Sequence, residues 1–207
     1  MKIIESCEQG SEEWLEIRLG KVTASRVSDV IKNGRGGAVS KTAESYMAEL
    51  IAEILTGESK PFFENEAMKW GTETEPQARS MYEIKNDFVD VKEVAFVEHN
   101  EFIGISPDGL IGEDGLLEIK APNTTTQIKR ALSNDYSSDY KAQIQMQLWV
   151  TERKWCDFVS FDPRLDCEAG YLQQRVERDE EFIEEMKEKV YKFVEEMNKS
   201  IIKLTTK

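Results

Sequence analysis

The spacing of apolar residues changes midway along this chain of 207 residues, and the change limits the folds open to it. Before about residue 88, apolar side chains recur every three or four positions, which is typical of amphipathic helices. Between Phe88 and Lys120 they occur in short runs with a period closer to two, separated by Gly, Asn, Asp and Pro. Both patterns return after residue 120. We therefore expect an α/β fold in which a mixed central β-sheet is flanked by helices.

The expected elements follow from these two periods and from the capping and turn residues between them. Helices are expected over residues 11–20, 23–31, 40–57, 66–85, 125–132, 140–150 and 179–199. Strands are expected over residues 88–91, 94–97, 102–105, 116–119, 155–161 and 170–176, and the first four are expected to form a meander. A domain has roughly 150 residues and the chain shows no repeat or linker, so residues 1–207 are expected to form one domain.

Cysteine and histidine are too scarce and too scattered for several kinds of site. The chain has three cysteines, Cys7, Cys156 and Cys167, and one histidine, His99. This argues against a disulfide scaffold, a four-cysteine zinc or iron–sulfur centre, and most zinc-hydrolase and Ser-His-Asp sites. Catalysis would have to use carboxylates and lysine. No apolar run reaches the roughly 18 residues of a membrane span, and the N-terminus lacks the apolar core of a signal peptide, so we expect a cytoplasmic protein without membrane association.

The segment with the clearest chemistry contains Pro107-Asp108 and, after a short gap, Glu118-Ile119-Lys120. Side chains alternate between the faces of a strand, so Glu118 and Lys120 are expected on one face and Ile119 on the other. A carboxylate from the turn at Asp108 can then meet Glu118 to form an oxygen-rich pocket, which suits Mg²⁺. The Lys120 ammonium can orient or deprotonate a metal-bound water and offset charge on a phosphate. This is the PD-(D/E)xK nuclease pattern, although these residue types also occur together by chance.

Two helical residues are candidates for completing this pocket. Glu75 lies on the helix that precedes the strands, and Gln143 lies on a helix that follows them. Glu73 and Glu75 are two positions apart and do not share a helix face, so only one of them can point at the site. The alternative for Glu75 and Gln143 is an ordinary solvated helix residue.

A basic cluster near the N-terminus contrasts with the acidic chain around it. Lysine and arginine number 27 and aspartate and glutamate 40, so the formal net charge is −13 and any contact with nucleic acid must be a local basic patch. Against the single acid Asp29, the segment 18–41 contains Arg18, Lys21, Arg26, Lys32, Arg35 and Lys41. The guanidinium groups of the arginines in this segment, together with the hydroxyl and N–H groups of residues 23–25, are suited to bind phosphate. The alternative is solubilising charge on exposed helices.

Four segments together resemble the lambda-type (YqaJ-like) phage recombination exonucleases, a branch of the PD-(D/E)xK superfamily. They are residues 9–25, 70–79, 106–120 and 140–150, and they stand in the order found in that family. The resemblance implies a restriction-endonuclease-like core and Mg²⁺-dependent 5′-to-3′ digestion of one strand of linear duplex DNA, which leaves 3′ overhangs for recombination. It also implies two ions per active site, with Mn²⁺ as an alternative metal, and a phage or prophage origin in a bacterial host.

The same resemblance implies a ring-shaped homotrimer that encloses the DNA end and works with a single-strand annealing protein. Such a ring would reconcile the net charge with DNA binding, because acidic residues, including those of the last helix, would lie outside and basic residues inside.

The resemblance also assigns roles at the metal site. Asp108, Glu118 and the backbone carbonyl of Ile119 would bind metal, and Lys120 would position the nucleophilic water. Glu75 would hold a metal ion or its water, and Gln143 would support these groups.

A second set of roles concerns the DNA. Arg18, Ser25 and Arg35 would receive the terminal 5′-phosphate. Met68 lies near the position of an apolar residue that helps to separate the strands in that family, although we expect core packing for Met68 here.

Two other functions remain open at this point. A metal site alone does not determine polarity, so the chain could be an endonuclease that is indifferent to ends. It could also be a non-catalytic scaffold that binds DNA ends during recombination.

Overall fold

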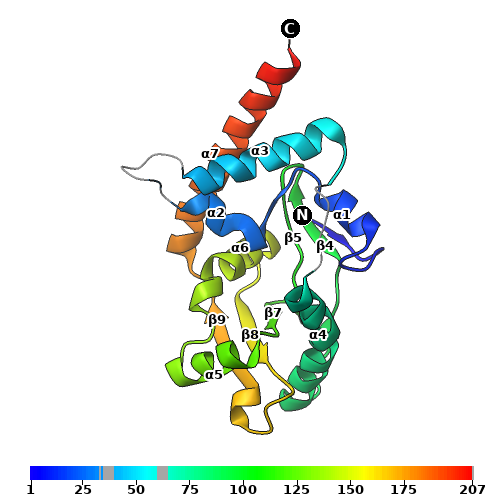
Figure 1. Cartoon of the computed structure of the whole chain (residues 1–207), viewed down its shortest axis with the longest axis vertical. Helices are drawn as coiled ribbons and strands as arrows, with labels where there is room; N and C mark the ends of the chain where they lie inside the picture. Colours follow the sequence, from blue (N-terminus) through cyan, green and yellow to red (C-terminus); the bar gives the residue numbers. More distant parts are fainter. Residues whose placement is uncertain (33, 35–39, 60–64, 207) are drawn as a thin grey trace.

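The computed structural model describes residues 1–32, 34, 40–59 and 65–206, which form two mixed β-sheets flanked by helices (Figure 1). The strands are β1 (Lys2–Ile4), β2 (Val22–Thr23), β3 (Val91–Lys92), β4 (Phe96–Asn100), β5 (Ile103–Ile105), β6 (Gly109–Ile111), β7 (Gly115–Lys120), β8 (Trp155–Phe161) and β9 (Tyr171–Glu177). The α-helices are α1 (Glu12–Arg18), α2 (Val27–Ile31), α3 (Lys41–Thr56), α4 (Glu66–Lys85), α5 (Thr124–Ser133), α6 (Lys141–Thr151) and α7 (Glu180–Thr205). The expected α/β architecture is confirmed, but the strands are shared between two sheets.

The order of strands is β1-β4-β5-β2 in the first sheet and β3-β6-β7-β8-β9 in the second. The pairs β2/β5 and β7/β8 are parallel and the other pairs are antiparallel. The expected meander between residues 88 and 119 is therefore wrong, because β4 and β5 belong to one sheet and β6 and β7 to the other. The chain crosses between the sheets at Ser106–Pro107–Asp108, where Pro107 has no N–H to continue a ladder. The first acidic residue of the motif thus lies at this crossing.

Several helices begin where the sequence supplies a capping side chain. Ser11, Ser40, Asn65, Asn123 and Asp179 each accept a hydrogen bond from a backbone N–H in the first turn of the helix that follows. These caps confirm the expected helix starts to within a residue or two.

One expected helix divides into three pieces. Residues 23–31 contain the end of β2, a 3₁₀ turn over Ala24–Arg26, and the short helix α2. The strand β2 pairs with β5, a partner about 80 residues further along the chain, and that long-range pairing replaces the first helical turn.

The two faces of the second sheet are covered by different helices. On one face, Ala78 and Tyr82 of α4 pack with Leu117 and Ile119 of β7. On the other face, apolar residues of α6 pack with Leu116 of β7 and with β8. Since side chains alternate along β7, Glu118 belongs to the α6 face together with Leu116. The sheet thereby orients Glu118 and Lys120 as the alternation predicted.

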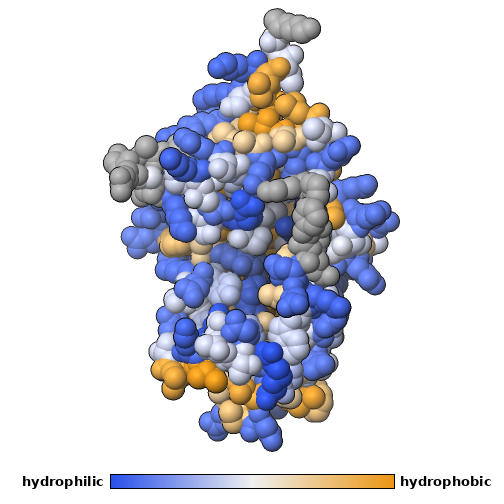
Figure 2. All heavy atoms as spheres, viewed as in Figure 1, coloured by the Kyte–Doolittle hydropathy of each residue, from blue (hydrophilic) through white to orange (hydrophobic). Residues whose placement is uncertain are grey.

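The helix α7 packs against the core through one face and extends beyond the rest of the molecule (Figure 1). Its buried residues are Ile183, Met186, Val190, Phe193 and Met197. The acidic residues Glu184, Glu185, Glu188 and Glu195 are exposed, as expected for its outer side. The helix ends at Thr205, which is later than expected. Figure 2 shows apolar atoms gathered over its end, where Ile202 and Leu204 are 61% and 65% exposed.

Among the described residues, no helix combines the length and the apolar character needed to cross a membrane.

Candidate active site

The carboxylate of Asp108 lies at the crossing between the two sheets, against strand β7. Its Oδ2 accepts a hydrogen bond of 2.6 Å from the backbone N–H of Ile119. Gly109 pairs with Leu117 in the antiparallel β6/β7 ladder, so continuing the register by one residue places Asp108 across from Glu118. The two acidic residues of the motif therefore come together.

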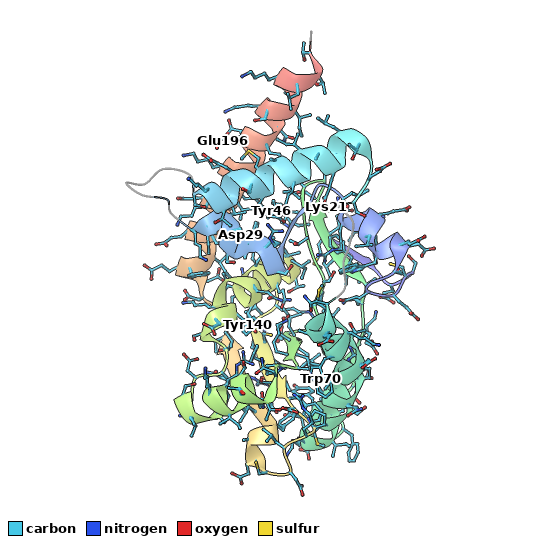
Figure 3. The ribbon with its side chains drawn as sticks, viewed as in Figure 1. Lys21, Asp29, Tyr46, Trp70, Tyr140 and Glu196 are labelled. Carbon is cyan, nitrogen blue, oxygen red and sulfur yellow. The ribbon has the colours of Figure 1, made fainter. Side chains whose placement is uncertain are left out.

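The side chain of Glu118 is fully buried, and both of its carboxylate oxygens accept hydrogen bonds. Oε1 accepts from the Lys120 ammonium and, at 2.5 Å, from Gln143 Nε2. Oε2 accepts from Gln147 Nε2 at 2.7 Å. Lys120 Nζ also lies 5.3 Å from the ring centroid of Tyr140, which Figure 3 labels at the start of α6. Three of the expected site residues, Glu118, Lys120 and Gln143, are thus in direct contact.

Glu75 joins this group through an arginine on its own helix. Arg79 Nη2 donates to Glu75 Oε1 at 2.5 Å and to the backbone carbonyl of Asp108 at 3.3 Å, and Arg79 Nη1 pairs with Glu93 at 2.8 Å. The other acidic residue on this turn, Glu73, is 61% exposed, and its Oε1 lies 3.8 Å from Lys69 Nζ. As expected, only one of the two glutamates points towards the site.

Burial and mutual repulsion change the proton affinities of these groups. Burial raises the pKa of Asp108 well above its usual value, and the charges of Glu118 and Glu75 raise it further against the opposing effect of Lys120. Burial also raises the pKa of Glu75, in spite of the nearby Arg79 and Lys120. Burial alone would lower the pKa of Lys120, but Glu118 and Asp108 outweigh it and the net shift is upward. Negative charge is therefore concentrated here beyond what Lys120 compensates.

This donor set fits a hard divalent cation that keeps part of its water shell. Asp108 and Glu118 supply carboxylate oxygens, and the backbone carbonyl of Ile119, the residue after Glu118, is a further oxygen ligand of the kind such an ion takes. Among the described residues, no three or more His, Cys, Asp or Glu side chains gather in a way that could hold a metal ion by themselves. Mg²⁺ can bind without such a group, because it takes one or two carboxylates together with water and substrate phosphate.

Arg18 lies beside the same crossing segment. Its Nη1 donates to Ser106 Oγ at 3.1 Å, and its guanidinium carbon lies 3.9 Å from the ring centroid of Trp14. Trp14 Nε1 donates to Ser106 Oγ as well, at 3.0 Å. Burial lowers the pKa of Arg18 to about 10, so the group is still charged at neutral pH. Within the described ranges Arg18 forms no ion pair, so its partly buried guanidinium is available to bind an anion. It contacts Ser106, which is two residues before Asp108 in the sequence.

Two of the other basic residues are less available than the sequence indicated. Lys21 pairs with Glu98 at 3.0 Å, and Arg26 pairs with Asp29 at 2.6 Å and with Glu49 at 3.3 Å. These acids, except Asp29, come from outside the basic segment, so the local charge is partly neutralised.

Of the other two predicted phosphate ligands, Ser25 lies among the described residues and Arg35 does not. Ser25 is exposed, and its Oγ lies 3.4 Å from Thr23 Oγ1. Tyr46 lies between this turn and Arg18, and Figure 3 shows it below α3 between Lys21 and Asp29. Its hydroxyl accepts a hydrogen bond from Thr23 N at 3.2 Å. Burial raises the pKa of Tyr46, and the positive charge of Arg18 opposes that shift. Arg35 lies outside the described residues.

Met68 is 39% exposed on the first turn of α4, so the expectation that it packs in the core is wrong. Sequence reasoning also missed the contacts of two residues. Arg79 lies four positions after Glu75, and Gln147 lies four positions after Gln143. That spacing places each on the same helix face as a predicted site residue, and it could have identified both.

Comparison with known proteins agrees with this geometry. Residues 13–154 match the YqaJ-like viral recombinase domain. The solved structure of an alkaline exonuclease (LHK-Exo) from Laribacter hongkongensis has 43% sequence identity and a TM-score of 0.86, with 94% of this chain and 96% of that chain covered. The same values hold for LHK-Exo in complex with dAMP. The fold is thus of the PD-(D/E)xK type, with mixed sheets flanked by helices.

Two more distant relatives extend the comparison. A phage-related exonuclease from Haemophilus somnus 129PT shares the fold, with a TM-score of 0.73 and 20% identity over 89% of this chain and 96% of that one. The uncharacterized protein R354 of Acanthamoeba polyphaga mimivirus is 29% identical over 180 residues, 77% of this chain, although the chain spans only 30% of that protein's length. Since the recombinase domain covers more than half of the residues, this chain belongs to the YqaJ-like viral recombinase domain family.

Proposed function

We propose that this chain is a Mg²⁺-dependent 5′-to-3′ exonuclease that degrades one strand of linear double-stranded DNA and leaves 3′ overhangs for recombination. The observation that carries the proposal is the cluster at the sheet crossing, where Asp108 lies across from Glu118 and Lys120 contacts Glu118. The relation to an alkaline exonuclease at 43% identity supports a nuclease reaction. The complex of that enzyme with dAMP supports a nucleoside monophosphate as the released product.

The carboxylates of Asp108 and Glu118 and the carbonyl of Ile119 would hold the metal, which is Mg²⁺ or Mn²⁺, with two ions per site. A bound ion supplies a Lewis acid for the phosphate and lowers the pKa of a bound water. Glu75 would hold a metal ion or its water from the α4 side. Lys120 would orient or deprotonate the attacking water and offset charge on the phosphate. Gln143 keeps Glu118 in place.

Polarity would come from the Arg18 side of the site. A guanidinium that is partly buried, stacked on Trp14 and unpaired within the described ranges is suited to the two negative charges of a terminal 5′-phosphate. Because Ser106 connects it to the Asp108 segment, a captured end would place the next phosphodiester near the metal ligands. Ser25 and Arg35 remain candidates for the rest of this pocket.

The assembly is part of the same proposal. A homotrimeric ring around the DNA end would keep the acidic outer surface of α7 away from the substrate, and a single-strand annealing protein would receive the exposed strand. The exposed apolar residues at the end of α7 are of the kind that marks contact with another protein. Light scattering should then give three times the chain mass of 23.8 kDa.

Digestion of a linear duplex labelled separately at each end tests the reaction. With Mg²⁺, the parent protein should release the 5′ label first, and EDTA or the variant Asp108→Ala should abolish release. A covalently closed circle should stay intact, because the enzyme needs an end. Cleavage of the circle would establish the endonuclease alternative instead. End binding without any release of nucleotide would support the non-catalytic scaffold.

A further inference from the structure

The side chain of Gln147 is an unusual component of the core. It is completely buried on α6, within a run from Ile144 to Thr151 in which every residue is buried. A buried amide is costly unless its polar atoms are paired. Its Nε2 is paired with Glu118 Oε2 at 2.7 Å, but its Oε1 has no partner among the described residues. A purely structural amide would be expected to satisfy both ends. This one is satisfied only where it meets Glu118.

The orientation of the amide follows from the charge of its partner. An ionised carboxylate only accepts hydrogen bonds, so Gln147 must present its NH₂ group and leave its own oxygen unpaired. Replacing Gln147 by an apolar residue would instead leave Glu118 Oε2 buried and unpaired, and an unpaired oxygen on a charged group is the costlier loss. The unpaired oxygen of Gln147 is thus explained by the requirement of Glu118.

The two oxygens of Glu118 have different surroundings. Oε1 is bound by Lys120 and Gln143, both only partly buried and both on the open side of the site. Oε2 is bound from within the core by Gln147. The terminal torsion of a glutamate is soft, so the carboxylate plane needs restraint from outside to hold one orientation. Gln143 and Gln147, one helical turn apart, supply that restraint from opposite oxygens.

We infer that Gln147 is a positioning residue for metal binding: it holds Glu118 Oε2 in the core and thereby leaves Oε1 oriented towards the divalent cation. The inference rests on the proposed function, because it assumes that Glu118 binds the ion. Gln147 itself is fully buried and touches neither cation nor DNA. Its loss should weaken cation binding by roughly 10- to 100-fold, the usual effect of removing a group that orients a metal ligand.

The test compares two Gln→Met variants on the same helix. Gln147→Met keeps the length of the side chain and removes the donor to Glu118. Gln145→Met is the matched control, because Gln145 is 1% exposed but bonds to Glu177 O and Asp179 N instead. Mn²⁺ and Mg²⁺ binding are measured by calorimetry without DNA, and the Mg²⁺ concentration for half-maximal nuclease rate is measured separately.

Gln147→Met should raise the cation dissociation constant and the half-maximal Mg²⁺ concentration by roughly 10- to 100-fold, while the rate at saturating Mg²⁺ recovers towards that of the parent. Gln145→Met should lower the melting temperature and leave both cation values unchanged. A folded Gln147→Met protein with the parent's cation affinity overturns the inference, and so does an equal loss in Gln145→Met.

A second variant covers the case in which Gln147→Met does not fold. Gln147→Asn retains a buried amide but is shorter by one methylene, which withdraws the donor from Glu118, and the same weakening of cation binding is expected. Unchanged cation binding in Gln147→Asn would also overturn the inference. If the parent itself binds neither Mg²⁺ nor Mn²⁺, the proposed function fails, and this outcome is distinct from parent binding that the variants leave unaltered.

Discussion

Replacing Arg18 by alanine should change which DNA ends the protein prefers. The guanidinium is partly buried beside Ser106 and Trp14, and its bond to Ser106 Oγ is the one hydrogen bond that it makes to the described residues. The other N–H groups of its fork are available to an anion. Ser106 keeps its bond from Trp14 Nε1 in the variant, so the segment leading to Asp108 retains one of its two anchors.

The size of the effect follows from the bonds that would be lost. A hydrogen bond to a charged group contributes about 1.5–3 kcal/mol, and a tenfold change in rate or affinity corresponds to about 1.4 kcal/mol. Losing one such bond to the terminal phosphate should therefore lower kcat/KM on 5′-phosphorylated duplex by about 10- to 100-fold. A 5′-hydroxyl end offers no phosphate to this guanidinium, so its kcat/KM should fall by only a few-fold.

The assay uses two duplexes of identical sequence that differ only in the 5′ group, and it compares the parent, Arg18→Ala and Lys21→Ala. Lys21 is the control for loss of one positive charge, because it already pairs with Glu98 at 3.0 Å and donates to the Glu101 carbonyl at 2.7 Å. Its removal should affect the two ends to the same small extent. Equal losses on both ends in Arg18→Ala would refute the phosphate role of this residue.

Three further results are expected. The preference for 5′-phosphate should be constant between pH 7 and 9, because the terminal phosphate gains its second charge near pH 6 and Arg18, with its pKa lowered to about 10, loses its charge only above this range; a steady decline within it would contradict the pairing. Glu75→Gln should lower the nuclease rate by roughly 10- to 100-fold, whereas Glu73→Gln, on the exposed side of the same turn, should not, and similar rates in the two would show that Glu75 has no special role. Tyr82→Phe removes a 2.7 Å bond to the buried Asp157 and should lower the free energy of unfolding in urea by about 1.5–3 kcal/mol with the same Mg²⁺ requirement; no change in stability would contradict the importance of that bond.

The features that could be predicted from the sequence are those set by neighbouring residues. The alternation along β7 correctly put Glu118 and Lys120 on one face and Leu117 and Ile119 on the other. Capping residues located the helices, including the end of α3 at Gly57, which adopts the left-handed conformation at φ 72°.

The pairing of strands could not be predicted in the same way. The apolar runs between residues 88 and 119 were identified as strands, but nothing in their own sequence states that two of them join a different sheet. The very short strands β1 and β6 were missed, because each has only two adjacent apolar residues and therefore no alternating pattern. They are stabilised by their partners β4, β3 and β7, and such pairing depends on the whole fold.

The charges of the site likewise depend partly on neighbouring residues and partly on residues from distant parts of the chain. The basic segment was evident, yet the acids that neutralise part of it, Glu49 and Glu98, come from elsewhere in the chain. The resemblance singled out Gln143, but only the fold shows that Gln147 holds the second oxygen of Glu118. Burial of Asp108 and its raised pKa likewise depend on the two sheets meeting at this point.

Soaking a crystal of the protein in Mn²⁺ would show whether Asp108 and Glu118 bind a metal ion, because anomalous scattering locates the ion. A peak is expected at roughly 2.0–2.3 Å from carboxylate oxygens of both Asp108 and Glu118, and it should disappear in Asp108→Ala. A peak elsewhere in the molecule, or none at these two carboxylates in a crystal with an open site at saturating Mn²⁺, would contradict this metal site.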